Sequence, residues 1–488
     1  MKKKLTILPL LLTTLMIVSC NKDDAPNAES VSVELTDHSQ TPNFLLKGSQ
    51  FPNLEIYSIL SSEDKLEESP DFVYGSMADG AGLLKNTDGT FTLINNIEAD
   101  YAIARITLDK TFKPVKGEYI VNSDATANTA QCSGSLITLE EHGFGPYYLS
   151  GGEWGGNSTN VFVINPYRDV AMASTAKTLF NFGSWTVENA VVLGKKAYNN
   201  KTVAFIGDDS HGEAGGQLAM YYSNVAGDLN NGKLYALKIG DGTIMDNDLD
   251  INKAYDVSFV ELKERTYDEL NQECMANGVM AFNRVEDIDY RKGSAENNRE
   301  IYFNATGRNQ YNDTRTKYGR VYKIVLDKNN PLKGQLSLVL DGDDLTGPAK
   351  DFHSPDNILV TENYAYIQED PNGYDDSIEK QHDARVYQYN LKTGAVKVVV
   401  ELDQHGAMVN AKDRFGDSYA KMDDRWGKCE ITGMIDISKE TGIRGTFILI
   451  VQGHTWKDDA FLNPDGAGTK ENSRDEGSML YVLKGLEI

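Results

Sequence analysis

Residues 351–370 place polar side chains at the ends of two short apolar runs. A polar turn that contains Asp356 precedes the first run, and the second run ends at Glu369. Two apolar runs separated by a polar break predict a β-hairpin, and carboxylates on its rim are the oxygen ligands that calcium binds. This stretch therefore predicts a hairpin that presents cation ligands at one edge of a β-rich fold.

Four further stretches combine an expected strand with reactive side chains at or near its end. Arg284 and Glu286 are expected to point the same way, because alternate residues of a strand share a face. Such a pair is usually only a salt bridge, and a single buried cysteine is more often an apolar filler than a ligand. In combination, a thiol with carboxylates suits iron, several carboxylates suit calcium, and a guanidinium holds phosphate. The stretches are 129–141 with Cys132, Glu140 and Glu141; 203–209 with Asp208 and Asp209; 279–286; and 429–454 with Cys429 and His454.

A strand-like phrase with a central Tyr or Phe recurs along the chain and predicts how these stretches are positioned. Helical periodicity is scarce apart from residues 266–276, where Thr266 and Glu269 fit a capping box. Repeated small β units favour radial repetition over a single sandwich. We therefore expect an all-β, six-bladed β-propeller with long inter-blade insertions, one short helical insertion, and ligands that meet at one mouth of the channel. The phrase occurs at residues 101–108, 160–165, 233–238, 320–325, 385–390 and 479–483.

The composition indicates a large, strongly acidic folded protein. The chain has 488 residues, is 40% hydrophobic and carries a formal net charge of −24. This charge argues against nucleic acid as the main partner, and it suits either a solvated surface or one that holds cations. Apart from Cys20, the cysteines are Cys132, Cys274 and Cys429, and their odd number leaves at least one thiol unpaired.

The N-terminal residues predict export and lipid attachment. Residues 1–20 combine lysines, a short apolar run and a cysteine, and they resemble a bacterial lipoprotein signal peptide with Cys20 as the lipidated residue. The alternative is an ordinary signal peptide with an incidental cysteine. Residues 21–37 are expected to be a flexible tether, and residues 38–488 the propeller domain. We therefore expect a lipid-anchored protein of the outer membrane, on either of its faces.

The motifs occur in the order seen in the PhoX alkaline phosphatase family, which the sequence resembles over residues 128–454. That resemblance implies a six-bladed propeller with an iron and calcium cluster that hydrolyses phosphate monoesters outside the cytoplasm. Two departures are the lipoprotein-like N-terminus, where the family commonly has a twin-arginine signal, and Val285, where a proline is common. The matching motifs lie at residues 132–134 with 140–141, 207–209, 282–286, 354–357 with 368–370, and 430–433 with 452–454.

The same resemblance implies roles for individual residues. Arg284 would hold the substrate phosphate, and Glu286 would be both a catalytic residue and an iron ligand. His211, His353 and His454 are candidates for protonating the leaving group, although an exposed loop histidine is the commoner interpretation of each. The expected metal ligands are Cys132 and Glu286 for iron, with Glu140 or Glu141 nearby; Asp356 and Glu369 for iron or calcium; and Asp208 or Asp209 for calcium.

Two other functions remain open on the sequence alone. The chain could be a non-catalytic surface propeller that binds a glycan or a peptide, with structural calcium only. It could instead be a propeller lactonase or esterase that uses a single calcium ion. Cys132 discriminates among the three functions, because a site that holds only calcium has no use for a thiolate.

Overall fold

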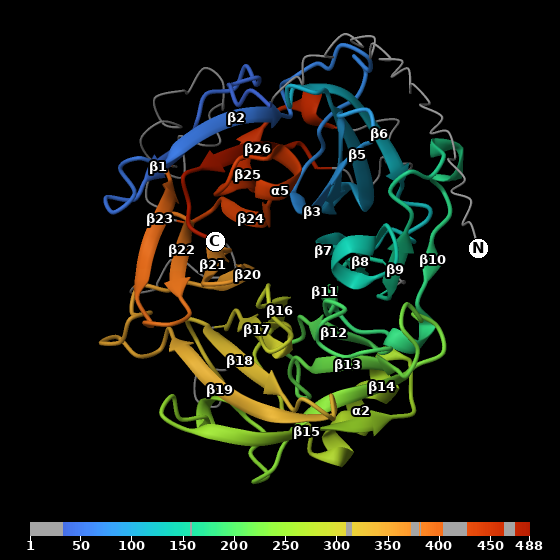
Figure 1. Ribbon diagram of the computed structural model, residues 1–488, viewed down its shortest axis with the longest axis vertical. Helices are drawn as coiled ribbons and strands as arrows, with labels where there is room; N and C mark the ends of the chain where they lie inside the picture. The colour runs from blue at the N-terminus through green and yellow to red at the C-terminus, as the bar shows by residue number, and fades with distance from the viewer. Residues whose placement is uncertain are drawn as a thin grey trace, which may run out of the picture. The chain divides into compact units, whose positions relative to one another are not determined.

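Antiparallel β-sheets make up almost all of the described chain, as Figure 1 shows. The computed structural model describes residues 33–156, 159–308, 315–371, 380, 382–403, 427–462 and 474–488. Cys20, the predicted signal peptide and residues 21–32 of the predicted tether lie outside these residues. The described part is an all-β, propeller-like arrangement with few helices, so the predicted fold class is confirmed at that level.

The described strands form five sheets. Three sheets have four strands each: β3 (Ala78–Lys85), β4 (Phe91–Ile97), β5 (Ala102–Leu108) and β6 (Pro114–Val121); β7 (Gln131–Ile137), β8 (Tyr147–Gly152), β9 (Val161–Ile164) and β10 (Lys177–Thr178); and β2 (Glu55–Ser61), β24 (Glu430–Asp436), β25 (Thr446–Lys457) and β26 (Glu476–Lys484). The five-stranded sheet contains β1 (Leu45–Lys47), β20 (Pro355–Val360), β21 (Tyr364–Glu369), β22 (Arg385–Asn390) and β23 (Val396–Leu402). The predicted hairpin in residues 351–370 is therefore confirmed as β20 and β21.

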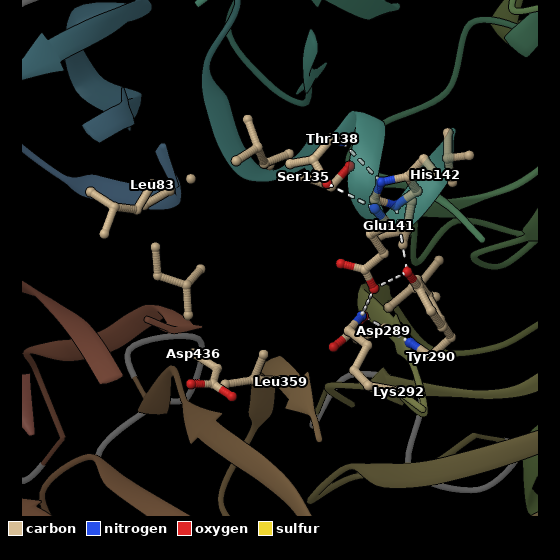
Figure 2. Close-up of a pocket in the computed structure, with 18 of the residues that line it drawn as sticks. Leu83, Ser135, Thr138, Glu141, His142, Asp289, Tyr290, Lys292, Leu359 and Asp436 are labelled. Atoms are coloured by element: carbon tan, nitrogen blue, oxygen red, sulfur yellow. Dashed lines mark hydrogen bonds and ion pairs between the residues drawn. The ribbon is translucent and has the colours of Figure 1, made fainter. Parts of the chain in front are cut away.

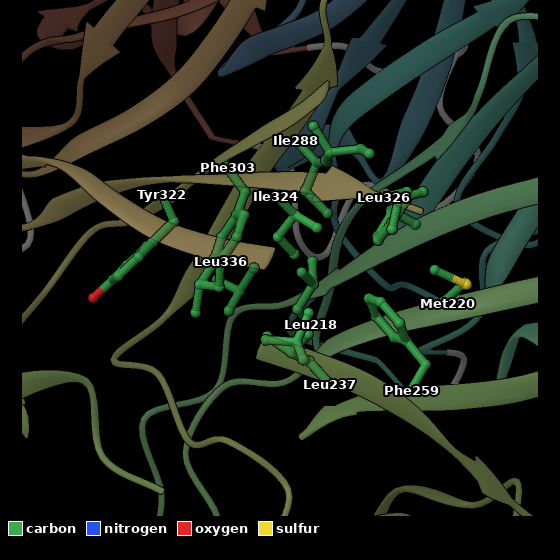
Figure 3. Close-up of a cluster of buried hydrophobic side chains, with 14 of the residues drawn as sticks. Leu218, Met220, Leu237, Phe259, Ile288, Phe303, Tyr322, Ile324, Leu326 and Leu336 are labelled. Carbon is green, nitrogen blue, oxygen red and sulfur yellow. The ribbon is translucent and has the colours of Figure 1, made fainter. Parts of the chain in front are cut away.

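The fifth sheet has nine strands and consists of two four-stranded meanders joined through β15 (Ala254–Leu262). β15 pairs with β14 on one side and with β19 on the other. Side chains of both meanders, among them Leu237 and Ile324, are fully buried in one apolar core (Figure 3). The meanders are β11 (Val187–Val192), β12 (Thr202–Asp208), β13 (Leu218–Ser223) and β14 (Lys233–Ile239); and β16 (Val285–Tyr290), β17 (Glu300–Ala305), β18 (Arg320–Leu326) and β19 (Lys333–Asp341).

The recurring aromatic phrase marks one strand in each four-stranded meander. The six phrases correspond to β5, β9, β14, β18, β22 and β26. The expected helix is confirmed as α2, which begins one residue later than predicted, but its capping differs: the Thr266 hydroxyl donates to the Glu269 carboxylate at 2.6 Å instead of capping a backbone N–H. The described helices are α1 (Leu139–His142), α2 (Tyr267–Asn277) and α5 (Ser438–Thr441), with 3-10 turns η1 (Glu98–Asp100), η2 (Val170–Met172), η3 (Phe180–Phe182), η4 (Asp246–Asp248), η5 (Asn297–Arg299) and η8 (Asp459–Phe461).

Six inner strands, β3, β7, β11, β16, β20 and β24, contact one another in a closed ring (Figure 1), and residues of all six line one cavity, which we call the central channel. Each of them has a β-bulge near its start, where two residues of the inner strand face one of its partner. Gly80 allows β3 to approach β7 at this level, because a Cβ at Gly80 would lie 2.2 Å from the backbone nitrogen of Gly134. A bulge bends the strand and redirects the side chains beside it, so the repeated bulge shapes one end of the channel.

N-terminal strands complete two sheets that are otherwise formed by later parts of the chain. β1 pairs with β23, and β2 pairs with β26. Cys132, Cys274 and Cys429 are buried, and none of them forms a disulfide with another residue that the structure describes. Within the described ranges, no helix is both long and apolar enough to span a bilayer.

Candidate metal centre

The inner strands bring ligand-type side chains to the end of the channel where the bulges lie. The second residue of an inner strand is an acid or a cysteine in five cases, and the sixth strand, β24, begins with an acid. In five strands this residue is part of the bulge, and in β24 it precedes the bulge; the local bend redirects these side chains toward the axis of the ring. The residues are Asp79 in β3, Cys132 in β7, Glu188 in β11, Glu286 in β16, Asp356 in β20 and Glu430 in β24.

A second set of acids comes from the strands that pair with the inner strands. In an antiparallel hairpin, the end of the second strand lies at the same edge as the start of the first. The residue directly after the second strand is therefore delivered to the same end of the channel. These acids are Glu98 after β4, Glu153 after β8, Asp209 after β12 and Asp370 after β21.

Nine of these residues form four overlapping groups that could each hold a metal ion. Within a group, one ligand atom of each residue lies within 4.8 Å of the others. The groups share members, so together they form one continuous site, which we call the acidic cluster. The groups are Asp79, Cys132 and Glu188; Glu98, Cys132 and Glu153; Glu188, Glu286 and Asp356; and Asp356, Asp370 and Glu430.

The electrostatics of the acidic cluster favour bound cations. Burial raises the pKa of Asp79, Glu188, Asp356 and Glu430 well above the usual range, and repulsion from neighbouring carboxylates raises it further. Burial, followed by the charges of Glu153 and Glu98, likewise raises the pKa of the Cys132 thiol. A cation bound here would offset both the burial and the repulsion. The donor set therefore fits metal ions, and its mixture of one thiol with many carboxylates fits both a transition metal and calcium.

Arg284 lies beside the acidic cluster in a left-handed backbone conformation, with a φ of 68°. Its Nε donates to Asp209 Oδ1 at 2.7 Å and its Nη2 to Asp209 Oδ2 at 3.3 Å, while Nη2 lies 2.6 Å from Glu286 Oε1. Although burial raises the pKa of Asp209, Arg284 and hydrogen bonds hold that pKa below its usual value. Residues 279–284 were expected to be strand, but β16 begins only at Val285. The turn at Arg284, not strand alternation, thus brings the guanidinium to Glu286.

Hydrogen bonds fix the orientation of several acidic-cluster side chains. Glu98 accepts from the Trp154 indole at 2.7 Å and from the Gln452 amide at 3.0 Å. The Cys132 thiol donates to Glu153 Oε2 at 2.5 Å. Behind Glu430, both ring nitrogens of His454 contact carboxylates: Nε2 lies 3.5 Å from Glu430 and Nδ1 lies 3.0 Å from Glu476. Burial lowers the pKa of His454, but the hydrogen bond and charge of Glu476, together with other nearby negative groups, raise it, and the net shift is upward.

His211 and Arg308 lie on the loops that hold the backbone of Arg284. The Arg284 N–H donates to the Ser210 carbonyl at 3.2 Å, and the Thr306 N–H donates to the Arg284 carbonyl at 3.0 Å. Nη1 of Arg308 lies 3.0 Å from each ring nitrogen of His211. Burial lowers the pKa of His211, and the charges of Arg308 and Arg284 lower it further against the opposing effect of Asp209. This side of the acidic cluster is therefore positively charged.

The structure does not bring Asp208 or Glu369 into the acidic cluster. Asp208 accepts backbone hydrogen bonds from Thr186 at 3.0 Å and Gln217 at 3.2 Å. Glu369 accepts from the backbone N–H of His353 at 2.8 Å and from that of Arg385 at 3.1 Å. Side-chain direction alternates along a strand, so Asp208 and Glu369 point to the side opposite to that of the next residues, Asp209 and Asp370. A role for Asp208 and Glu369 as metal ligands stays a prediction.

Glu140 and Glu141 lie in α1, the short helix that follows β7, at the opposite end of the inner strands from the acidic cluster. They line a cavity of about 490 Å³ formed by the later halves of the inner strands. Figure 2 shows Glu141 beside Tyr290, whose hydroxyl donates to it, and Leu83 across the cavity. Glu140 forms an ion pair with Lys439. Of the predicted site residues, Cys132, Asp209, Arg284, Glu286 and Asp356 are brought together, whereas Glu140 and Glu141 are not.

Six members of the acidic cluster were not predicted from the sequence. A position-specific signal does exist: in β3, β11, β16 and β20, the acid is followed by Gly, Asn or Asp at the start of a largely buried strand. The acids that follow β4, β8 and β21 carry no such local signal, because their role depends on which strand end faces the channel. The unpredicted residues are Asp79, Glu98, Glu153, Glu188, Asp370 and Glu430.

Comparison with known proteins identifies the family. The family model for alkaline phosphatase PhoX matches residues 157–449, which is more than half of the chain. No curated protein matches the sequence. Among solved structures, Pseudomonas fluorescens PhoX in complex with vanadate, a transition state analogue, is similar with a TM-score of 0.61 and 11% identity, over 93% of this chain and 98% of that chain. An α-L-arabinofuranosidase from Fusarium graminearum aligns with a TM-score of 0.41 and 11% identity, over 87% of this chain and 97% of that chain.

The two kinds of comparison agree. The likeness to the Pseudomonas structure extends over almost the whole chain and concerns the fold, while the sequence match spans β9 to β25 and includes Arg284, Glu286 and Asp356. The chain belongs to the PhoX alkaline phosphatase family.

Proposed function

We propose that this protein is an extracytoplasmic phosphomonoesterase that uses iron and calcium ions held by the acidic cluster. The observation that carries the proposal is the set of four overlapping ligand groups, with a single thiol among carboxylates, beside the guanidinium of Arg284. Membership of a phosphatase family supports the same activity. We also propose that the two meanders of the nine-stranded sheet act as separate blades, which gives a six-bladed propeller around the site.

The donor chemistry divides the acidic cluster between the two metals. The groups that contain Cys132 suit iron, because a thiolate is a soft ligand for a transition metal. The groups built only from carboxylates, which share Asp356, suit calcium. When bound, these cations would supply Lewis-acid neutralisation of the phosphoryl oxygens. Glu140, Glu141, Asp208 and Glu369 lie outside the acidic cluster, and a role for them as metal ligands stays a prediction.

Arg284 is the residue that would hold the phosphate during the reaction. Its side chain is 14% exposed, whereas those of Asp209 and Glu286 are 7% and 2% exposed, so the guanidinium is the most accessible member of this group. Asp209 and Glu286 fix the plane of the guanidinium, and the positive φ fixes where the side chain leaves the backbone. A guanidinium held in this way stabilises negative charge on a phosphoryl group without reorganising during the reaction.

Export and anchoring follow from the N-terminal sequence. We propose that residues 1–20 are removed as a lipoprotein signal peptide and that Cys20 carries the lipid that anchors the protein to the outer membrane. Mass spectrometry of the protein from membrane fractions would test this proposal. A lipid-modified Cys20 at the mature N-terminus is expected, whereas a soluble, unmodified protein would contradict it.

Elemental analysis combined with a phosphatase assay tests the proposed activity. We expect the purified protein to contain iron and calcium and to hydrolyse p-nitrophenyl phosphate, and we expect a chelator to abolish this activity. Cys132→Ser should lower iron content and activity roughly 100-fold or more, because it removes a ligand. Cys274→Ser, at a buried thiol in α2, is the matched control and should leave both unchanged.

Two outcomes would favour the other functions. A protein without iron whose activity survives Cys132→Ser would contradict the metal assignment, and ester or lactone turnover with calcium alone would indicate a calcium-dependent esterase. A protein that binds a glycan or peptide but turns over no phosphate ester would be a binding protein.

A further inference from the structure

The channel end that carries the acidic cluster also carries a positively charged group that the proposed chemistry does not use. Arg308 forms no ion pair with any acid in the described ranges, although acidic residues outnumber basic ones by 72 to 48 in this chain. Its side chain is half-buried, and its described contacts are with the ring of His211. A guanidinium that is partly removed from water without a carboxylate is a site where an anion can bind.

The backbone that leads into Arg308 pairs with the backbone of Asn283 and Arg284. The Thr306 N–H donates to the Arg284 carbonyl at 3.0 Å, and the Gly307 N–H donates to the Asn283 carbonyl at 3.0 Å. The segment before Arg308 therefore runs alongside the segment that ends in Arg284. The charges of Arg308 and Arg284 both act on the ring of His211, and in the described ranges the carboxylates of Asp209 and Glu286 pair with Arg284 and not with Arg308.

Hydrogen bonds from Arg315 hold the loop that carries His211 in place. Arg315, which is 4% exposed, donates from Nη1 to the carbonyls of His211 at 3.2 Å and Gly212 at 2.8 Å, and from Nη2 to the carbonyl of Glu213 at 3.0 Å. A buried arginine that binds three successive carbonyls fixes the shape of this loop, which would otherwise be loosened by Gly212, Gly215 and Gly216. The ring of His211, which contacts Arg308, is therefore presented in a defined position, and a preorganised contact costs little entropy on binding.

We propose that Arg308 and His211 form a subsite for a second anionic group of the substrate, a carboxylate or phosphate a few bonds from the ester phosphate held by Arg284. This inference rests on the proposed phosphatase function and adds the substrate class: phosphate esters whose alcohol part is itself anionic. Arg308 supplies charge-assisted hydrogen bonds to that group, and His211 positions Arg308.

A matched pair of substrates tests the subsite. 3-Phosphoglycerate carries a carboxylate where glycerol 3-phosphate carries a hydroxymethyl group, and the two are otherwise alike. We expect Arg308→Ala to raise the KM for 3-phosphoglycerate roughly 10-fold to 100-fold, the value of a charged hydrogen bond, and to change the KM for glycerol 3-phosphate by no more than about twofold. Arg308→Lys, which keeps the charge, should restore part of the difference.

Controls separate failure of the subsite from failure of the proposed function. Arg444→Ala removes an exposed arginine between α5 and β25 and should leave both KM values unchanged. A second measurement uses inhibitors that are not turned over. Arg308→Ala should weaken the inhibition of p-nitrophenyl phosphate hydrolysis by phosphonoacetate, which carries a carboxylate, and should leave the inhibition by ethylphosphonate unchanged. Equal effects of Arg308→Ala on both substrates, or no effect on either, would overturn the subsite alone. Absence of turnover with every phosphate ester would overturn the proposed function and the subsite with it.

Discussion

Replacing Arg284 with lysine tests whether the guanidinium stabilises the reacting phosphoryl group or merely balances charge. Lysine keeps the positive charge beside Asp209 and Glu286, but its single ammonium cannot reproduce the three contacts of 2.7, 3.3 and 2.6 Å that the guanidinium makes. Loss of one preorganised donor to an oxyanion lowers kcat about 100-fold to 1,000-fold, which corresponds to roughly 3–4 kcal/mol. We expect a loss of this size for Arg284→Lys, with nearly unchanged thermal stability.

Arg284→Ala should behave differently, because it also leaves two carboxylates without their cation. The side chains of Asp209 and Glu286 are only 7% and 2% exposed, so breaking this buried pairing should cost roughly 3–5 kcal/mol of stability. Bound cations would offset part of this loss, which should therefore be largest in chelator.

The assay measures kcat and KM with p-nitrophenyl phosphate and the free energy of unfolding in urea, for both variants and for Arg105→Lys. Arg105 is the matched control, since it forms a half-buried ion pair with Glu118 at 2.8 Å in an outer strand, away from the acidic cluster. It should change stability slightly and kcat not at all. If Arg284→Lys kept kcat within about threefold of the wild-type value, the assignment of phosphate binding to Arg284 would be refuted.

Three further predictions concern the scaffold and the metals. Gly80→Ala should lower the free energy of unfolding by roughly 1–3 kcal/mol and weaken metal binding, because the new Cβ would lie 2.2 Å from the Gly134 nitrogen and push β3 away from β7. Gly212→Ala is the control, since the nearest atom to its new Cβ would be 3.8 Å away. Equal melting temperatures of the two variants would contradict this reasoning. Burial lowers the pKa of His142 from 6.5 to about 4, so between pH 6.5 and pH 4 the unfolded chain binds the proton more tightly than the folded chain. The free energy of unfolding therefore falls as the pH falls through this range, and the loss should reach roughly 2.5 kcal/mol at pH 4.5. His142→Gln should lack this component in urea titrations at pH 7 and pH 4.5, and an unchanged slope would disprove it. Chelation should lower the melting temperature, because ligands that bind only the folded state stabilise it, and added calcium should restore part of the shift in calorimetry; an unchanged melting temperature would count against bound metals.

Much of the scaffold could be predicted from local patterns. The aromatic phrase marks one strand in each meander because strand periodicity and turn residues act over a few residues. The hairpin of β20 and β21 and the helix α2 are likewise local features. The joining of two meanders through β15 is not, since pairing between β15 and β19 depends on packing between segments about 80 residues apart, as the contact between Gln335 and Asp256 illustrates.

The site was harder to predict because acids occur in adjacent pairs. In residues 208–209 and 369–370, only the second acid lies beyond the strand end and faces the acidic cluster or Arg284, and side-chain direction alternates along a strand. Glu140 follows Cys132 by eight residues, most of them in β7, and at about 3.3 Å per residue the strand carries it roughly 20 Å away. Proximity in sequence to Cys132 was therefore misleading, while Asp79 and Glu188, each more than 50 residues away in sequence, are its neighbours in space.

The pairing of β1 and β2 with late strands has a consequence for how the protein matures. A hydrogen bond between Phe44 and Tyr481 joins residues 437 positions apart, so the seam of the ring closes only after nearly the whole polypeptide has been made. Contacts this distant in sequence slow folding, and until they form, β23 and β26 expose unpaired edges that can capture another chain. Since β24 supplies Glu430 from the sheet that β2 completes, full metal affinity should develop only at this last step. Metal binding would then distinguish molecules whose ring has closed from molecules whose ring is still open.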